Sequence, residues 1–375
     1  MSRFKIFSVV VLVLAAIGLF SRPVFAQTSI RLGAYLPMTG GVAAYGKMVW
    51  SGIQIAKSME PEVLGKKLDI ILLDTKSEQI EASNAVSLLV EMKIAGIIGE
   101  AISADTMAGN PISEKAQIPS VSPTATNPLV TQGKKYAFRA CFIDPFQGEV
   151  AARFVEKDLK AKTAALIIDH AQDYSVGLGN FFEKEFEKLG GKIVSKTFIL
   201  TGDQDFSAQL SSIQASKPDL IYAPIYYTED ALLAKQARDL GMQIPIVTGD
   251  GAQVDQLIQI GGKAVEGMYF TGHFHKDAAT TERAKEFTKL YEAQYKEEVN
   301  AFSALGADAY FLLVDAIKRA DSTDGSKVRD ALANSKDFNG VSGSLTMGQD
   351  GDPIKSVVIN KVENGKFVYV TTVTP

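Results

Sequence analysis

The chain has 375 residues, of which 46% are hydrophobic and 22% are charged, so it can bury a large core and divide into about two domains. Its formal net charge of −4 argues against nucleic acid and anionic membrane surfaces as partners. Its single cysteine, Cys141, excludes an internal disulfide, and the fold must therefore depend on hydrophobic packing.

The N-terminal residues have the pattern of a secretory signal peptide. Arg3 and Lys5 precede the apolar run Ile6–Phe20, and small residues stand at the two positions that a signal peptidase reads before residue 27. The alternative, a membrane anchor, needs an apolar run of about 20 residues, and this run is shorter. We therefore expect residues 1–26 to be removed and the protein to be periplasmic. Because the only cysteine is far from the cleavage site, we do not expect a lipoprotein.

Strand-like and helix-like patterns then alternate along the chain. In the first part, strands are expected at Ser29–Tyr35, Lys67–Asp74, Ala95–Gly99, Pro119–Val121 and Tyr136–Arg139, and helices at Val42–Met59, Glu78–Met92 and Ser103–Lys115. In the helix over 78–92, the apolar stripe consists of Ile80, Ala85, Leu88 and Leu89.

The middle of the chain repeats this scheme, and the end departs from it. Helices are expected at Phe146–Leu159, Val176–Leu189, Phe206–Gln214 and Glu229–Leu240, with strands at Thr163–Ile168, Lys192–Ile199, Asp219–Ile225 and Ile244–Val247. The chain ends in two long helices, Thr281–Glu297 and Ala301–Ala320, and a hairpin with an Asn-Gly turn, Ser356–Lys361 and Lys366–Val373.

This alternation predicts an α/β fold with two lobes, each with a parallel-rich sheet that helices cover on both faces. Ligands of such sheets bind beyond the carboxyl ends of the strands. Two lobes facing each other would form a cleft at their interface, where small-molecule sites are common.

The sequence has few residues arranged for catalysis. No phosphate-binding loop, dinucleotide fingerprint or Gly-x-Ser-x-Gly elbow occurs. His170, at a strand end, could line a pocket but has no recognisable partner as a catalytic base. His273-x-His275 could chelate a metal, but no third ligand is suggested, and we interpret the pair as a surface or hinge connection. We interpret Cys141 as a small buried residue. We therefore expect no enzyme activity, no metal and no cofactor.

Seven segments, in order along the chain, carry a family resemblance. They are SIRLGAYLPMTGGVAAYG (29–46), AGIIGEAISADT (95–106), IPSVSPTATNP (118–128), DHAQDYSVG (169–177), GDQDFSAQL (202–210), AKQARDLGMQIPIVTGDG (234–251) and AFSALGADA (301–309). Together they resemble the leucine/isoleucine/valine-binding proteins, which are type I periplasmic binding proteins and serve ABC transporters.

The resemblance implies two Rossmann-like lobes joined by a three-crossing hinge that close on an amino acid. On that basis lobe one comprises 27–144 plus 276–352, and lobe two 145–275 plus 353–375. It also implies that the protein works as a monomer and delivers its ligand, an aliphatic or branched-chain amino acid, to the membrane subunits of an ABC permease.

The resemblance further implies which residues hold the ligand. The carboxylate-binding positions fall on Ser103 and Thr126, the ammonium-binding acidic position on Asp250, a backbone carbonyl for the ammonium on Thr124, the aromatic wall on Tyr45, Tyr174, Tyr226 and Phe302, and apolar lining on Ile102. The competing interpretation is that the hydroxyl residues are ordinary helix caps and the aromatic residues ordinary packing.

Some residues depart from the family pattern. The ammonium-binding position is commonly glutamate, and Asp250 is one methylene shorter. Glu100 and Asp105 could favour a polar or cationic ligand side chain, and Ala307 replaces a frequent tyrosine. The alternatives are therefore a receptor for an aromatic acid, amide or urea-like solute, a sensory ligand receptor, and a periplasmic enzyme.

Overall fold

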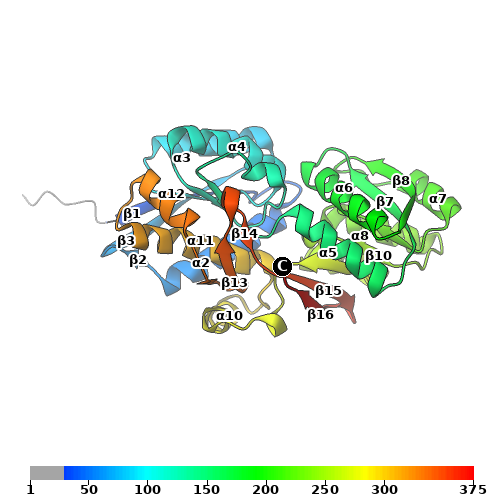
Figure 1. The fold of residues 1–375 in the computed structure, drawn as a ribbon. Coiled ribbons are helices and arrows are strands. Elements are labelled where there is room, and N and C mark those ends of the chain that lie inside the picture. Colours follow the sequence, from blue (N-terminus) through cyan, green and yellow to red (C-terminus); the bar gives the residue numbers. More distant parts are fainter. Residues whose placement is uncertain (1–28) are drawn as a thin grey trace, which may run out of the picture.

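The computed structural model describes residues 29–375, so the predicted signal peptide lies outside the described part. Two lobes lie side by side, each built around its own sheet (Figure 1). The predicted α/β fold with two parallel-rich lobes is thereby confirmed. Within residues 29–375, no helix is both long and apolar enough to span a bilayer.

The first lobe has a six-stranded sheet in the order β2-β3-β1-β4-β5-β6. Its strands are β1 (Ser29–Leu36), β2 (Glu62–Val63), β3 (Lys66–Asp74), β4 (Ile97–Gly99), β5 (Ser120–Ser122) and β6 (Ala137–Arg139). All neighbours are parallel except β2 and β3. Its helices are α2 (Ala43–Met59), α3 (Gln79–Glu91), α4 (Ser103–Ala116), α10 (Glu282–Tyr295), α11 (Ala301–Ala320) and α12 (Gly325–Ala333). Helices α3 and α4 cover one face and α2 and α11 the other (Figure 1).

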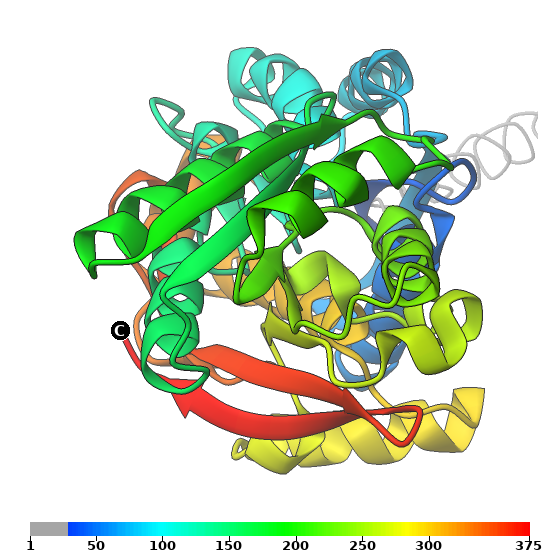
Figure 2. The ribbon, with the colours of Figure 1, turned by 90° about the vertical axis from the view of Figure 1, so that its right-hand side faces the viewer.

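The second lobe has a seven-stranded sheet in the order β16-β15-β11-β10-β9-β7-β8. Its strands are β7 (Thr163–Asp169), β8 (Lys192–Ile199), β9 (Leu220–Tyr222), β10 (Ile246–Thr248), β11 (Tyr269–Gly272), β15 (Val357–Glu363) and β16 (Lys366–Val373). Strands β7 to β11 pair in parallel, while β15 and β16 add an antiparallel hairpin at the edge (Figure 2). Its helices are α5 (Asp144–Lys157), α6 (Asp173–Lys188), α7 (Ser207–Ser216), α8 (Tyr227–Asp239) and α9 (Asp255–Gly261).

The chain passes between the two sheets three times: between β6 and α5, after β11, and before β15. A third, three-stranded sheet of β12 (Phe338–Asn339), β13 (Ser344–Met347) and β14 (Pro353–Ile354) precedes the last passage. Because β14 pairs with β13, this passage begins after Ile354, slightly later than the predicted boundary at residue 352. The division into domains itself stays a prediction.

Helices α2 and α11 pack very closely, and this packing positions part of the cleft. A Cβ atom at Gly52 would collide with the backbone of Ser303, and one at Gly306 would collide with the backbone of Val49. The two glycines therefore allow the helix backbones to approach each other, which brings the first turns of both helices together at the interface of the lobes.

The predicted apolar stripe of α3 is wrong in part. Ile80 and Leu88 are 76% and 47% exposed, whereas the buried face of this helix consists of Ala82, Ala85, Val86 and Leu89. The buried face is made mostly of small residues because α3 lies against α4. The larger apolar side chains at 80 and 88 point to solvent, although their spacing in the sequence predicts that they are buried.

Candidate functional site

A cavity lies between the two lobes and brings together all nine residues that the sequence singled out. It is lined by Tyr45, Ala101, Ile102, Ser103, Thr124, Thr126, Tyr174, Tyr226, Asp250, Gly251 and Phe302. Its volume is only about 20 Å³, which is close to the room that one water molecule needs. The lobes are therefore closed upon each other, and they would have to separate to admit a ligand larger than water.

Direct hydrogen bonds across the interface support this closed arrangement. Each joins a residue of the first lobe to one of the second: the Tyr45 hydroxyl donates to the Gly251 carbonyl at 2.7 Å, the Tyr227 hydroxyl to the Gly41 carbonyl at 3.2 Å, and the Asn127 amide to the Asp173 carbonyl at 2.9 Å. These contacts would break if the lobes separated.

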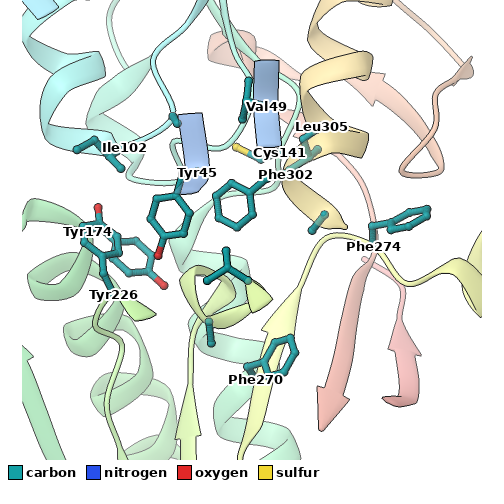
Figure 3. Packing of buried hydrophobic residues seen from close by; sticks show 14 of the residues in the cluster. Tyr45, Val49, Ile102, Cys141, Tyr174, Tyr226, Phe270, Phe274, Phe302 and Leu305 are labelled. Atoms are coloured by element: carbon teal, nitrogen blue, oxygen red, sulfur yellow. The ribbon is translucent and has the colours of Figure 1, made fainter. Parts of the chain in front are cut away.

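Aromatic side chains from both lobes form one wall of the cavity (Figure 3). Tyr45 and Phe302, from the first turns of α2 and α11, stack with ring centroids 4.3 Å apart. Tyr174 stacks on Tyr226 at 5.4 Å, and Tyr226 meets the Tyr45 ring edge-on at 5.6 Å. Such rigid rings give a ligand apolar contact at low cost in conformational entropy.

The first lobe contributes hydroxyl groups and a helix N-terminus. Ser103 is the first residue of α4, and its Oγ accepts a hydrogen bond from the Asn127 backbone N–H at 3.2 Å. Thr124 donates its hydroxyl to the Ala101 carbonyl at 2.6 Å, and Thr126 also lines the cavity. The unsatisfied N–H groups and the positive dipole end of a helix favour an anion at this position.

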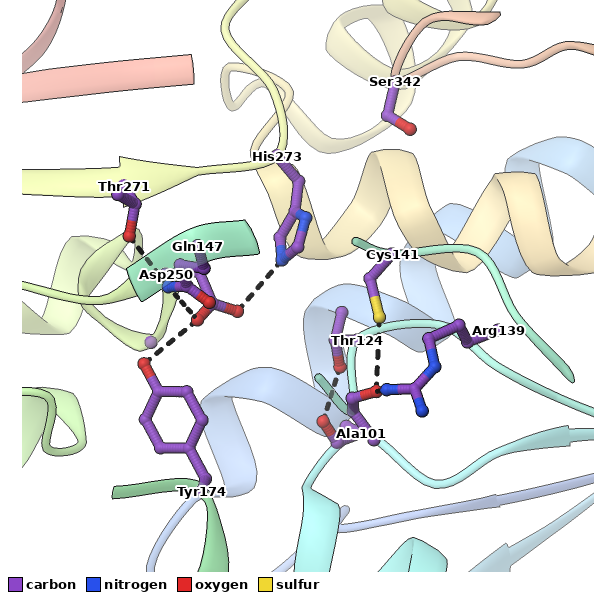
Figure 4. Close-up of polar contacts among 12 residues, drawn as sticks. Ala101, Thr124, Arg139, Cys141, Gln147, Tyr174, Asp250, Thr271, His273 and Ser342 are labelled. Carbon is purple, nitrogen blue, oxygen red and sulfur yellow. Dashed lines mark hydrogen bonds and ion pairs between the residues drawn. The ribbon is translucent and has the colours of Figure 1, made fainter. Parts of the chain in front are cut away.

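The second lobe contributes a carboxylate at the opposite end. Asp250 begins a short 3₁₀ turn (Asp250–Ala252) directly after β10, and only 5% of its surface is exposed. Its Oδ1 accepts hydrogen bonds from the Gln147 amide at 2.8 Å and the Tyr174 hydroxyl at 3.0 Å. Its Oδ2 lies 3.0 Å from Nε2 of His273 (Figure 4). A carboxylate held in this way can receive a cationic ligand group.

Two further acidic residues lie behind the cavity and do not line it. Glu100 is fully buried, and its carboxylate accepts from the Thr75 hydroxyl and the Ile102 backbone N–H, both at 2.7 Å. Burial raises the pKa of Glu100 well above its usual range, and burial together with Glu78 raises the pKa of Asp105 to about 7. Neither carboxylate therefore offers the ligand a cation site inside the cavity.

The sequence analysis missed two residues at the site, Gln147 and His273. The His273-x-His275 pair, expected in a surface or hinge connection, lies in the connecting passage after β11, and both residues are buried and do not lie on the surface. His170 is exposed and Cys141 is buried, the latter as expected. Among the residues from 29 onward, no cluster of three or more His, Cys, Asp or Glu side chains could hold a metal.

Comparisons with known proteins show the family and the fold of the chain. A family model described as "Periplasmic binding protein" matches residues 29–366. The Leu/Ile/Val-binding protein BraC3 of Rhizobium johnstonii is 32% identical over 349 residues, covering 92% of this chain and 94% of that protein.

Two solved structures have the same fold over almost their entire length. The leucine-binding protein LivK of Thermotoga maritima is 48% identical, with a TM-score of 0.91, over 92% of this chain and 99% of that one. The branched-chain amino acid-binding protein LivJ of Streptococcus pneumoniae, solved with isoleucine, is 32% identical, with a TM-score of 0.87, over 92% of this chain and 100% of that one. The resemblance drawn from the seven sequence segments is confirmed.

Proposed function

The chain belongs to the periplasmic binding protein family, and on that premise we propose that it captures a branched-chain amino acid between its lobes and delivers it to the permease of an ABC transporter. Its relatives are named as leucine, isoleucine and valine binders and as substrate-binding proteins of branched-chain amino acid transporters. A protein of this family binds its solute and does not transform it.

The polarity of the cavity is the observation that carries this proposal. One end presents Ser103, Thr126 and the N-terminus of α4, which suit a carboxylate. The other end presents Asp250, the one charged residue in the lining, which suits an ammonium group. Aromatic and aliphatic side chains lie between the two ends. A zwitterion with an apolar side chain complements all three features.

The same feature argues against the alternative ligand class. An aromatic acid, an amide or a urea-like solute lacks the ammonium, and its binding would leave the buried Asp250 carboxylate without a counter-charge, which is costly. A ligand that carries both an ammonium and a carboxylate group can bind the polar groups of both lobes at once and so favours closure.

A thermal-unfolding screen would test the proposal. The protein is incubated with each natural amino acid, benzoate, leucinamide and 4-methylpentanoate, the last two lacking the carboxylate and the ammonium of leucine. A ligand at about 100 times its dissociation constant stabilises the folded state by about 2.7 kcal/mol. We expect the largest shift with leucine, isoleucine or valine, and recovery of the ligand unchanged. A larger shift with benzoate or 4-methylpentanoate would refute the proposal.

We also propose that the mature protein is periplasmic and acts as a monomer. The support for export is the basic and apolar pattern of residues 1–26, together with the family. N-terminal sequencing of the protein recovered from a periplasmic extract should begin at Gln27. A mature protein that retains Met1 in the membrane fraction would contradict the export route.

A further inference from the structure

The carboxylate of Asp250 is held by three donors from separate segments. Gln147, in the first turn of α5, and Tyr174, on α6, both donate to Oδ1, at 2.8 and 3.0 Å. His273, in the passage after β11, faces Oδ2 at 3.0 Å. Each carboxylate oxygen has two lone pairs, so Oδ1 is fully engaged and Oδ2 has one lone pair left. Of the three donors only Tyr174 lines the cavity, so Gln147 and His273 act from behind.

The imidazole of His273 is fixed by its surroundings. Only 3% of the residue is exposed, and the ring stacks on Phe142 with a centroid distance of 3.7 Å. Phe142 lies in the passage between β6 and α5, so both partners of this stack are in segments that join the lobes. Because a carboxylate is acceptor-only, Nε2 must carry the proton that it shares with Asp250. Nδ1 then is a bare acceptor, and it has no hydrogen-bond partner among residues 29–375.

We propose that His273 is a positioning residue for the ammonium group of the ligand: its Nε2–H holds Oδ2 of Asp250 so that the remaining lone pair of that oxygen faces the cavity. The inference rests on the proposed function, because it requires an ammonium at Asp250. It deepens that function by adding a residue that the ligand does not touch, and it makes binding depend on the protonation of one imidazole.

The charges around His273 set the direction of this dependence. Burial lowers the pKa of His273, while Asp250 opposes the shift and the buried Lys355 adds to it. The ring is therefore neutral near neutral pH and gains its proton in acid. Burial and the Asp250 charge raise the pKa of the neighbouring Asp144 well above its usual range, so that group stays neutral.

A protonated His273 would place a positive charge beside the carboxylate and compete with the ligand's ammonium. The complex therefore binds protons less well than the free protein, and by linkage the affinity falls as the pH falls. Asp105, whose pKa is about 7, also gains a proton as the pH falls, but its effect has the opposite sign. Its protonation removes a negative charge close to Ser103 and would strengthen the binding of a carboxylate. An acid-induced loss therefore points to His273.

Calorimetric titration with L-leucine at about pH 7 and about pH 5 tests the inference, because the ligand's own groups do not titrate in that interval. The variants are His273→Gln, which keeps a donor but has no titrating ring, His273→Leu, which has neither, and His275→Gln as the matched control. His275 lies two residues away and faces the Phe367 carbonyl instead of Asp250.

We expect the wild-type protein and His275→Gln to lose affinity at least about threefold in acid. His273→Gln should bind within about threefold of wild type at neutral pH and show no such loss, whereas His273→Leu should bind about tenfold more weakly at both pH values. Any one of three results overturns the inference: a loss of affinity in acid that persists in His273→Gln, no loss of affinity in acid in the wild type, or normal binding by His273→Leu. If His273→Leu does not fold, the pH profile of His273→Gln decides. Unchanged L-leucine binding by Asp250→Asn would instead refute the proposed function, and the inference with it.

Discussion

Replacing Asp250 by asparagine removes the only charge in the lining of the cavity and leaves its shape almost unchanged. The asparagine carbonyl can still accept from Gln147 and Tyr174, and its amide can donate to Nε2 of His273 if that ring moves its proton to Nδ1. Nδ1 is free of other partners within the described residues, so this tautomer has no competing contact to break. We therefore expect the free energy of unfolding without ligand to change by at most about 1 kcal/mol.

Ligand binding should respond very differently to Asp250→Asn. A buried ammonium that has lost its counter-charge costs about 3–5 kcal/mol. By the relation between free energy and dissociation constant, this corresponds to about 150- to 5,000-fold weaker binding of L-leucine. Calorimetric titration measures the affinity, and thermal unfolding of the ligand-free protein measures the stability.

Asp255→Asn is the matched control for this experiment. Asp255 lies at the start of α9, is exposed, and does not line the cavity. It should leave the affinity unchanged while making the same change in net charge. If Asp250→Asn bound L-leucine within about threefold of wild type, the charge at residue 250 would not be the partner of the ammonium. A strong loss of stability in Asp250→Asn would refute the tautomer argument.

Two further predictions concern the other end of the ligand and the closure of the lobes. Ser103→Ala and Thr126→Ala should each weaken L-leucine binding by about 1.5–3 kcal/mol. The double variant should weaken binding by less than the sum of the two effects, because on the proposed function both hydroxyls bind one carboxylate. Equally tight binding of leucinamide would contradict this prediction. Tyr45→Phe removes the hydroxyl that donates to the Gly251 carbonyl across the interface, and it should weaken L-leucine binding by about 0.5–1.5 kcal/mol. It should also give a larger radius of gyration in small-angle scattering. The control, Tyr369→Phe, removes a hydroxyl on the β15–β16 hairpin and should change neither the affinity nor the radius of gyration.

The sequence predicts elements well where local signals and tertiary packing agree. Both ends of α11 are predicted correctly, at Ala301 and Ala320, because Asn300 and Ser303 form a capping box and nearly the whole helix is buried. Strand β11 was not predicted, since four residues that include Thr271 and Gly272 give no clear alternation. Its place in the sheet depends on pairing with β10 and β15, which local sequence does not encode.

At the site, the sequence predicts the residues that face the cavity but not the residues that hold them in place. The lining residues lie at the ends of strands and the starts of helices, where the family motifs are, and the sequence could therefore name them. Gln147 and His273 meet Asp250 from 103 and 23 residues away along the chain, in contacts that exist only after the lobes' connecting segments have packed. The nearest signal was the pair of histidines in one connection. Its interpretation required knowing that residue 273 turns inward to the carboxylate while residue 275 turns to β16. Because these buried donors fix the orientation of the Asp250 carboxylate, we expect Gln147 and His273, which the sequence does not reveal, to tune how strongly the lining residues bind the ligand.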